Sequence, residues 1–373
     1  MAGIYVHIPF CKQKCIYCNF YSVASQKDKE AYWDALCQEM ALTQDFLPTK
    51  IIDTLYFGGG TPSLCTPSEL DRIINELQKY YHFNEGFEFT MEANPEQLTP
   101  EYLRSFRELG MNRLSIGVQS FNDEILRLLN RRHSAAEAVT AVNNAAEAGF
   151  TNLSVDLIYD IAFRTKEMWE SDLRTALSLP LCHLSAYSLT VEENTILARQ
   201  VAGGKPFVPD ECDTERDYNL LLELTEAAGF EQYEISNYAK GGMVSRHNYA
   251  YWTRTPYLGL GASAHSYCGD IRRWNVANLR PYIDGMLRGE PVRESETLDT
   301  DTQYNEMVLL RLRTNAGLSL SELSQTFGDD YKDLLLRQLK TVRKDYYFLT
   351  VDNLRLTCAG RLFADAVAME LFA

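Results

Sequence analysis

The chain has 373 residues, of which 46% are hydrophobic and 23% are charged, a composition typical of soluble globular proteins. Its formal net charge of −15 gives it little attraction for a phosphate backbone, so we expect no nucleic-acid partner. No stretch reaches the roughly 20 apolar residues of a membrane span, no signal peptide is visible, and most of the nine cysteines are scattered, which together predict a cytoplasmic protein without a transmembrane segment.

The chain opens with an apolar run, Gly3 to Ile8, which predicts a strand that Pro9 ends. Cys11, Cys15 and Cys18 follow at once, with the spacing C-x3-C-x2-C. Thiolates are the ligands that select zinc and iron–sulfur clusters, and a closed site usually takes four ligands. Three thiolates on a four-iron cluster would leave one iron open to a substrate. A zinc site with a distant fourth ligand, or three unrelated thiols, is the alternative.

Strands and helices then alternate over the first half of the chain. The pattern predicts strands at 54–57, 88–92, 113–118, 151–158 and 182–188, and helices at 29–46, 67–80, 99–109, 123–129, 135–148 and 166–179. With the first strand, this alternation predicts an α/β fold, a parallel sheet closed in part into a six-unit (β/α) barrel. In such barrels the chemistry gathers at the carboxyl ends of the strands.

Glycine or polar residues follow the predicted strands, where this rule expects a site. Residues 58–61, Gly-Gly-Gly-Thr, come after the second strand, where glycine lets backbone approach a ligand, although a tight turn is the alternative. Glu92 ends the third strand and Gln119 follows the fourth. Asp156 lies within the apolar fifth strand, where a charge is costly without a partner. Arg131 could pair with Asp156 or with a carboxylate of a ligand.

The second half of the chain predicts two further parts. Residues 201–209 contain glycine and proline and are typical of a linker, and 211–228 predicts a helix. Beyond residue 300, helices and a hairpin with Asp352 and Asn353 as its turn predict a small α+β winged-helix-like domain, in which Ser319 and Glu322 begin one helix. The predicted domains are the partial barrel with its cysteine loop at 1–200, a barrel-completing segment at 201–295 and the C-terminal domain at 296–373.

The cysteine loop resembles that of the radical S-adenosylmethionine (SAM) superfamily. YVHIPFC, GGGTP, GVQSFN, LLNRRH and DLIY, in this order, resemble the branch that contains the oxygen-independent coproporphyrinogen III oxidases. The resemblance implies a [4Fe-4S] cluster on the three cysteines, with SAM on the open iron. It implies that this SAM contacts Tyr5, Gly59 and Glu92. The positions that touch a second SAM in the oxidase correspond to Tyr17, Gly60, Thr61, Gln119, Arg131 and Asp156. After DLIY, relatives usually have glycine where this chain has Asp160.

Residues 247–252, His-Asn-Tyr-Ala-Tyr-Trp, resemble the HNxxYW signature of the HemW-type heme chaperones. Histidine is a heme-iron ligand, and aromatic rings suit the face of a porphyrin. A His-Asn turn beside core aromatic residues would give the same pattern. The resemblance implies that His247 contacts heme. His265, in a glycine-rich stretch, is a second candidate ligand.

Three features favour a heme chaperone over the oxidase. The oxidase carries a fourth cysteine where this chain has Phe20, it has an extension before the first strand, and it lacks HNxxYW. The resemblance therefore implies a chaperone that binds the cluster, SAM and heme, delivers heme to acceptor proteins and has no coproporphyrinogen III oxidase activity. The alternatives are that oxidase, which decarboxylates two propionates, and a radical SAM methyltransferase. Aromatic residues near the HNxxYW segment could mediate a homodimer.

Overall fold

A computed structural model describes residues 1–205, 207 and 211–373. The linker expected over 201–209 lies partly outside these residues, and its first two residues end helix α7 (Ile196–Ala202). Among the described residues, no helix is long and apolar enough to cross a membrane.

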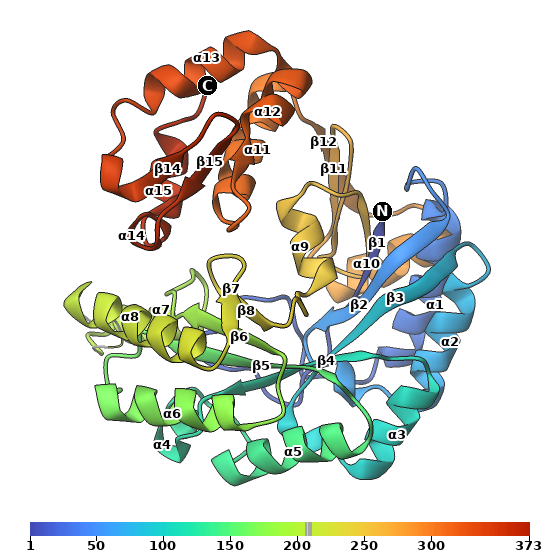
Figure 1. Ribbon diagram of the computed structural model, residues 1–373. Helices are drawn as coiled ribbons and strands as arrows, with labels where there is room; N and C mark the ends of the chain where they lie inside the picture. Colours follow the sequence, from blue (N-terminus) through green and yellow to red (C-terminus); the bar gives the residue numbers. More distant parts are fainter. Residues whose placement is uncertain (206, 208–210) are drawn as a thin grey trace.

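Six parallel strands form the centre of the main sheet. They are β1 (Gly3–Ile8), β2 (Ile51–Gly59), β3 (His82–Ala93), β4 (Arg113–Gln119), β5 (Asn152–Tyr159) and β6 (His183–Ser188), and they pair in sequence order. The helices that connect them lie on the outer side of the curved sheet (Figure 1), namely α1 (Lys29–Thr43), α2 (Pro67–Leu77), α3 (Pro100–Glu108), α4 (Asp123–Leu128), α5 (Ala135–Glu147) and α6 (Lys166–Ser178). The predicted partial (β/α) barrel is confirmed.

Side-chain caps decide where several of these helices begin. Thr66 accepts a hydrogen bond from the Glu69 amide, and the Glu69 side chain accepts one from the Thr66 amide. Ser134 and Glu137 form the same reciprocal pair at the start of α5. Each such cap stabilises its helix by about 1 kcal/mol. Short 3-10 turns follow two strands, at Pro62–Leu64 and Pro95–Gln97.

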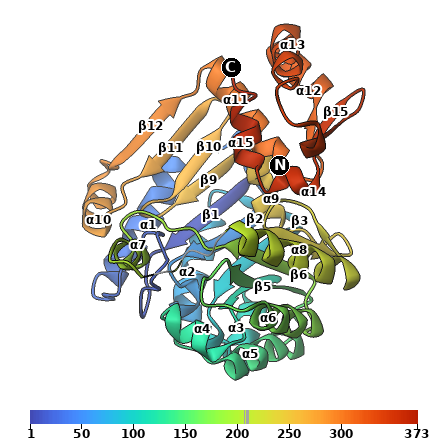
Figure 2. The same ribbon diagram turned by 90° about the vertical axis from the view of Figure 1, so that its left-hand side faces the viewer.

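The sheet continues beyond both edges of this six-stranded centre. Next to β1 lie β9 (Tyr257–Leu260), which is parallel to it, and then β10 (His265–Cys268), β11 (Ile271–Asn275) and β12 (Arg293–Thr297), as Figure 2 shows. Next to β6 lie β8 (Asn237–Lys240) and β7 (Phe230–Gln232). The helices of this half are α8 (Glu211–Ala227), α9 (Arg246–Trp252) and α10 (Leu279–Arg288). These short strands were not predicted from the sequence.

The C-terminal part has its own hydrophobic core and its own sheet, in the order β13-β15-β14. Its elements are α11 (Thr300–Leu312), β13 (Leu318–Ser319), α12 (Leu320–Phe327), α13 (Asp329–Gln338), a 3-10 turn at Lys344–Tyr346, β14 (Tyr347–Leu349), β15 (Asn353–Leu356), α14 (Cys358–Arg361) and α15 (Ala364–Met369). Ser319 caps α12 through the Glu322 amide, at 3.1 Å, as predicted. The predicted turn is wrong by one residue, because Asn353 pairs with Ser319 as the first residue of β15.

Glu39 of α1 connects the barrel to the part of the sheet beyond β1, namely β9 to β12, which we call the sheet extension. Its carboxylate is 1% exposed and accepts hydrogen bonds from the Gly261 amide (2.7 Å), the Asn275 side chain (2.6 Å) and the Tyr282 hydroxyl (2.7 Å). Burial raises the pKa of Glu39, and these three donors oppose that rise. One carboxylate thus satisfies donors from three segments that lie more than 200 residues later in the chain.

We expect Glu39→Ala to lower the free energy of unfolding by about 3 kcal/mol or more, because it leaves three buried donors without an acceptor. Chemical denaturation of the purified protein measures this loss. Glu30→Ala, on the exposed side of the same helix, is the matched control and should change stability by about 0.5 kcal/mol or less. Equal losses in the two variants would contradict the role given to Glu39.

Candidate functional site

The three cysteines lie on the loop that follows β1, at the carboxyl end of the parallel strands. Cys11 begins this loop, and its amide donates to the Val23 carbonyl at 3.0 Å. The amides of Gly60 and Thr61 donate to the carbonyls of Ile8 and Phe10, so the glycine loop after β2 supports the cysteine loop. All three cysteines are half-buried and line one cavity of about 440 Å³.

This cavity, which we call the cluster cavity, brings together most of the residues predicted from the sequence. It is lined by Cys11, Cys15, Tyr17, Cys18, Gly59, Gly60, Thr61, Glu92, Gln119, Arg131 and Asp156. Tyr5, His247 and His265 are the predicted residues that do not line it. The cavity also contains Asn94, which the sequence analysis did not select although it follows β3 directly.

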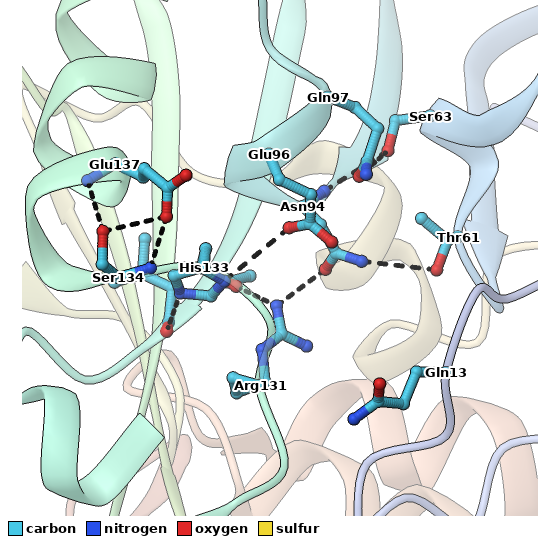
Figure 3. A network of polar contacts seen from close by, with 12 residues as sticks. Gln13, Thr61, Ser63, Asn94, Glu96, Gln97, Arg131, His133, Ser134 and Glu137 are labelled. Carbon is cyan, nitrogen blue, oxygen red and sulfur yellow. Dashed lines mark hydrogen bonds and ion pairs between the residues drawn. The ribbon is translucent and has the colours of Figure 1, made fainter. Parts of the chain in front are cut away.

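A chain of hydrogen-bonded polar side chains joins two of the cysteines. The Thr61 hydroxyl donates to the Cys11 sulfur at 3.4 Å, and the Arg131 guanidinium donates to the Cys15 sulfur at 3.4 Å. Asn94 is the central link of this chain, because it donates to Thr61 at 3.4 Å and accepts from Arg131 at 2.7 Å (Figure 3). Donors that point at sulfur stabilise the thiolate form, and such outer partners orient metal ligands.

Arg131 and Asp156 do not form the direct pair that the sequence analysis considered. Besides Cys15 and Asn94, the guanidinium donates to the Gly117 carbonyl. The Asp156 carboxylate instead accepts from the Ser115 hydroxyl at 3.1 Å. Burial raises the pKa of Asp156. Arg131 therefore acts on the cysteine loop in this structure.

Glu92 closes the inner end of the cluster cavity. Its two oxygens accept from the Tyr56 hydroxyl at 2.8 Å and from the Gly59 amide at 3.0 Å. Burial raises the pKa of Glu92 to about 7, although both hydrogen bonds favour the carboxylate. Gly59 has φ 107°, and a Cβ there would lie 2.5 Å from the His7 ring, so this position requires glycine. A cationic group brought near Glu92 would favour its ionised form.

Two residues at the cavity side of the sheet adopt left-handed backbone conformations without being glycine. Gln119 has φ 71° at the end of β4, and Asp160 has φ 61° just after β5. Ser188 donates a hydrogen bond to the Asp160 carboxylate. Asp160 thus adopts a conformation that glycine reaches without strain.

His247 lies close to Gly3, at the start of β1, whereas the cysteines follow the end of this strand. Its Nδ1 is hydrogen bonded to the Thr54 hydroxyl at 2.8 Å and its Nε2 to the Tyr251 hydroxyl at 2.9 Å. The ring is 1% exposed and stacks on Tyr56. Burial lowers the pKa of His247 to about 3, so the imidazole is neutral. Both ring nitrogens are therefore engaged within the protein in this arrangement.

The cysteine geometry bears on the choice between zinc and a cluster. Within the described ranges, no three His, Cys, Asp or Glu side chains converge as ligands of a single ion must. The thiolates of a four-iron cluster bind different iron atoms, so they need not converge on one point. Burial raises the pKa of Cys18 to about 11 and also raises that of Cys11, so iron would have to displace their protons. The three thiols, their spacing and the hydrogen bonds that point at two of their sulfur atoms fit a four-iron cluster.

Two family models match the chain. The one described as the radical SAM superfamily matches residues 5–176, and the one described as the HemN C-terminal domain matches residues 298–363.

Proteins from distant organisms resemble the chain over its whole length. The heme chaperone HemW of Bacillus subtilis (strain 168) is 36% identical over 372 residues, which cover 98% of each chain. The mitochondrial radical S-adenosyl methionine domain-containing protein 1 of Danio rerio is 32% identical and covers 98% of this chain and 86% of its own. The solved structure of coproporphyrinogen III oxidase (HemN) from Escherichia coli, a radical SAM enzyme, matches with a TM-score of 0.86 and 25% identity, over 100% of this chain and 90% of that chain.

The raised pKa of Glu92 predicts a pH dependence of stability in the metal-free protein. The folded state binds the Glu92 proton more tightly than the unfolded chain, in which the pKa has its ordinary value of 4.5. This contribution to stability is therefore complete below about pH 4.5 and is lost as the pH rises through about 7. Relative to Glu92→Gln, the free energy of unfolding should fall by about 3 kcal/mol over this range. A pH-independent difference between the two proteins would contradict the shift.

Proposed function

Because the chain belongs to the HemW family of the radical SAM superfamily, we propose that it is a cytoplasmic heme chaperone. It binds a [4Fe-4S] cluster, SAM and heme, and it delivers heme to acceptor proteins. The observation that carries this proposal is the full-length similarity to a HemW heme chaperone at 36% identity. The cluster cavity supports it, because sulfur ligands, sulfur-directed donors and a buried carboxylate line one space of about 440 Å³.

Each part of the cluster cavity has a role in this proposal. Cys11, Cys15 and Cys18 hold the cluster, which when bound supplies an open iron for SAM and an electron for its reduction. Glu92 accepts from the amino group of SAM, and this cation favours the carboxylate form that Tyr56 and Gly59 already stabilise. The remaining predicted residues of the cavity shape the space around the nucleoside.

The oxidase remains a second candidate because of the structural match to HemN, at a TM-score of 0.86. Phe20 favours the chaperone. The oxidase carries its fourth cysteine at this position, whereas here the position presents an apolar ring that is 65% exposed. An exposed phenyl ring cannot ligate metal or relay a proton, but it offers a surface to a flat apolar ligand.

Replacing Cys11, Cys15 and Cys18 with serine should remove the iron and sulfide of the anaerobically reconstituted protein. Iron and sulfide analysis with visible absorption measures this loss. Cys358→Ser, at an exposed cysteine far from the loop, should retain the full content. The iron and sulfide content of Asn94→Ala should lie between those of these two variants. Its cluster affinity should be lower by about 10- to 100-fold, because the substitution breaks the chain of hydrogen bonds that orients the ligands. Full iron content in the triple variant would contradict the assignment of Cys11, Cys15 and Cys18 as the cluster ligands.

The heme-loaded protein should transfer its heme to a heme-free cytochrome that holds heme non-covalently. The Soret band should move to the position of the acceptor, because the acceptor provides the more complete heme site. Under anaerobic conditions with SAM and a reductant, the same preparation should not convert coproporphyrinogen III. Formation of the decarboxylated product, detected by chromatography, would instead support the oxidase.

A further inference from the structure

We propose that heme docks in a second, aromatic cavity beside the cluster cavity. His265, not His247, provides the imidazole ligand to its iron. This inference rests on the proposed heme-binding function. This second cavity, which we call the aromatic cavity, has a volume of about 470 Å³. Its walls include Tyr5, Phe20, Tyr21, Tyr251, Tyr257 and His265. They come from β1, the cysteine loop, α9, β9 and β10, which converge where β1 meets the sheet extension.

The walls of the aromatic cavity suit a porphyrin. Tyr251 and Tyr257 pack edge to face, with ring centroids 4.7 Å apart, and form one side. Tyr5 and Phe20 contribute further rings, and Phe20 lines both the aromatic cavity and the cluster cavity. Sites for flat organic ligands are lined largely by apolar and aromatic side chains, with polar groups placed among them. Here five aromatic rings line the cavity together with the polar side chains of His7, Asn19, Ser263 and His265. The position of Phe20 also places such a ligand next to the cluster cavity.

His265 is the imidazole that is available in this cavity. Its ring is exposed and stacks on Trp274 at a centroid distance of 5.8 Å, and no hydrogen bond to the ring is found in the part of the chain that the structure describes. The buried histidines are His7, His133, His183 and His247, and each of them has a ring nitrogen in a hydrogen bond. His82 is exposed but lies at the start of β3, outside the aromatic cavity.

The protonation states of the cavity also favour imidazole ligation. Burial raises the pKa of Tyr257 to about 12 and that of Tyr251 well above its ordinary value. Iron would therefore have to displace a proton to bind either phenol, whereas a neutral imidazole binds iron directly.

The glycine-rich stretch before His265 explains how this residue reaches the cavity. A Cβ on Gly259 would lie 2.0 Å from the His265 carbonyl oxygen, so only glycine lets β10 approach β9 here. Gly261 has φ 102°, and a Cβ there would lie 2.3 Å from the Tyr32 hydroxyl. The two glycines allow the tight connection that brings His265 back toward β9.

His247 contributes to this site through Tyr251. The hydrogen bond of 2.9 Å between the His247 Nε2 and the Tyr251 hydroxyl fixes the tyrosine ring in the cavity wall. The HNxxYW segment therefore presents an aromatic ring to heme, while its histidine is a positioning residue. Substitution of His247 should weaken heme binding without removing the imidazole ligand from the iron.

Heme titration of the anaerobically reconstituted protein, followed by absorption and electron paramagnetic resonance spectra, tests the assignment. His265→Ala should bind heme at least tenfold more weakly and lose the spectrum of imidazole-ligated iron, and added imidazole should restore that spectrum. His82→Ala, the matched exposed control, should behave as the unmodified protein does. Equal iron and sulfide contents in all variants would show that the cluster and the fold are retained.

Two outcomes separate this inference from the proposed function. If the unmodified protein binds heme and His265→Ala keeps its affinity and spectrum, or if His247→Ala alone loses the imidazole spectrum, the His265 site is wrong and the heme chaperone stands. If the unmodified protein binds no heme, both the site and the proposed function fall.

Discussion

The pairing of β1 on both of its edges is the constraint on which the rest of the structure depends. Its register with β2 aligns His7 with Gly58 and Ile8 with Gly59, which sets the cysteine loop against the glycine loop. Its register with β9 aligns Tyr5 with Gly259, which brings the sheet extension to the same strand. Because both neighbours run parallel to β1, the cluster cavity and the aromatic cavity open next to each other on either side of the cysteine loop.

The two cavities differ in chemistry although they share a wall. The cluster cavity collects a guanidinium, an ammonium group, four amide side chains and three carboxylates around sulfur, groups that can stabilise a charged cofactor and a zwitterionic ligand. The aromatic cavity offers rings and one accessible imidazole. A space lined by thiols and charged groups beside one lined by aromatic rings is what a protein needs if it is to hold a cluster and a porphyrin at the same time.

The sequence predicted the centre of the fold and of the cluster cavity because both follow from local rules. Six apolar runs alternating with helices determine the barrel, and the rule on strand ends places Glu92, Gln119 and Asp156 on one side. Strands β7 to β12 have three to five residues each, too few to show a period, so sequence patterns could not find them. Asn94 was missed because a single amide before proline also suits an ordinary turn. The exposure of His265 depends on how closely β10 approaches β9, which is set by tertiary contacts at Gly259.

The Glu39 carboxylate on α1 determines how the chain can be truncated. Residues 1–200 contain every strand of the six-stranded centre, yet Glu39 in this stretch is satisfied only by groups from residues 261, 275 and 282. Without them an anion would remain in an apolar interior, and β1, with Ile4, Val6 and Ile8 buried, would become an unpaired apolar edge open to self-association. We therefore expect fragments that end near residue 200 to be less stable and more prone to self-association than the full chain.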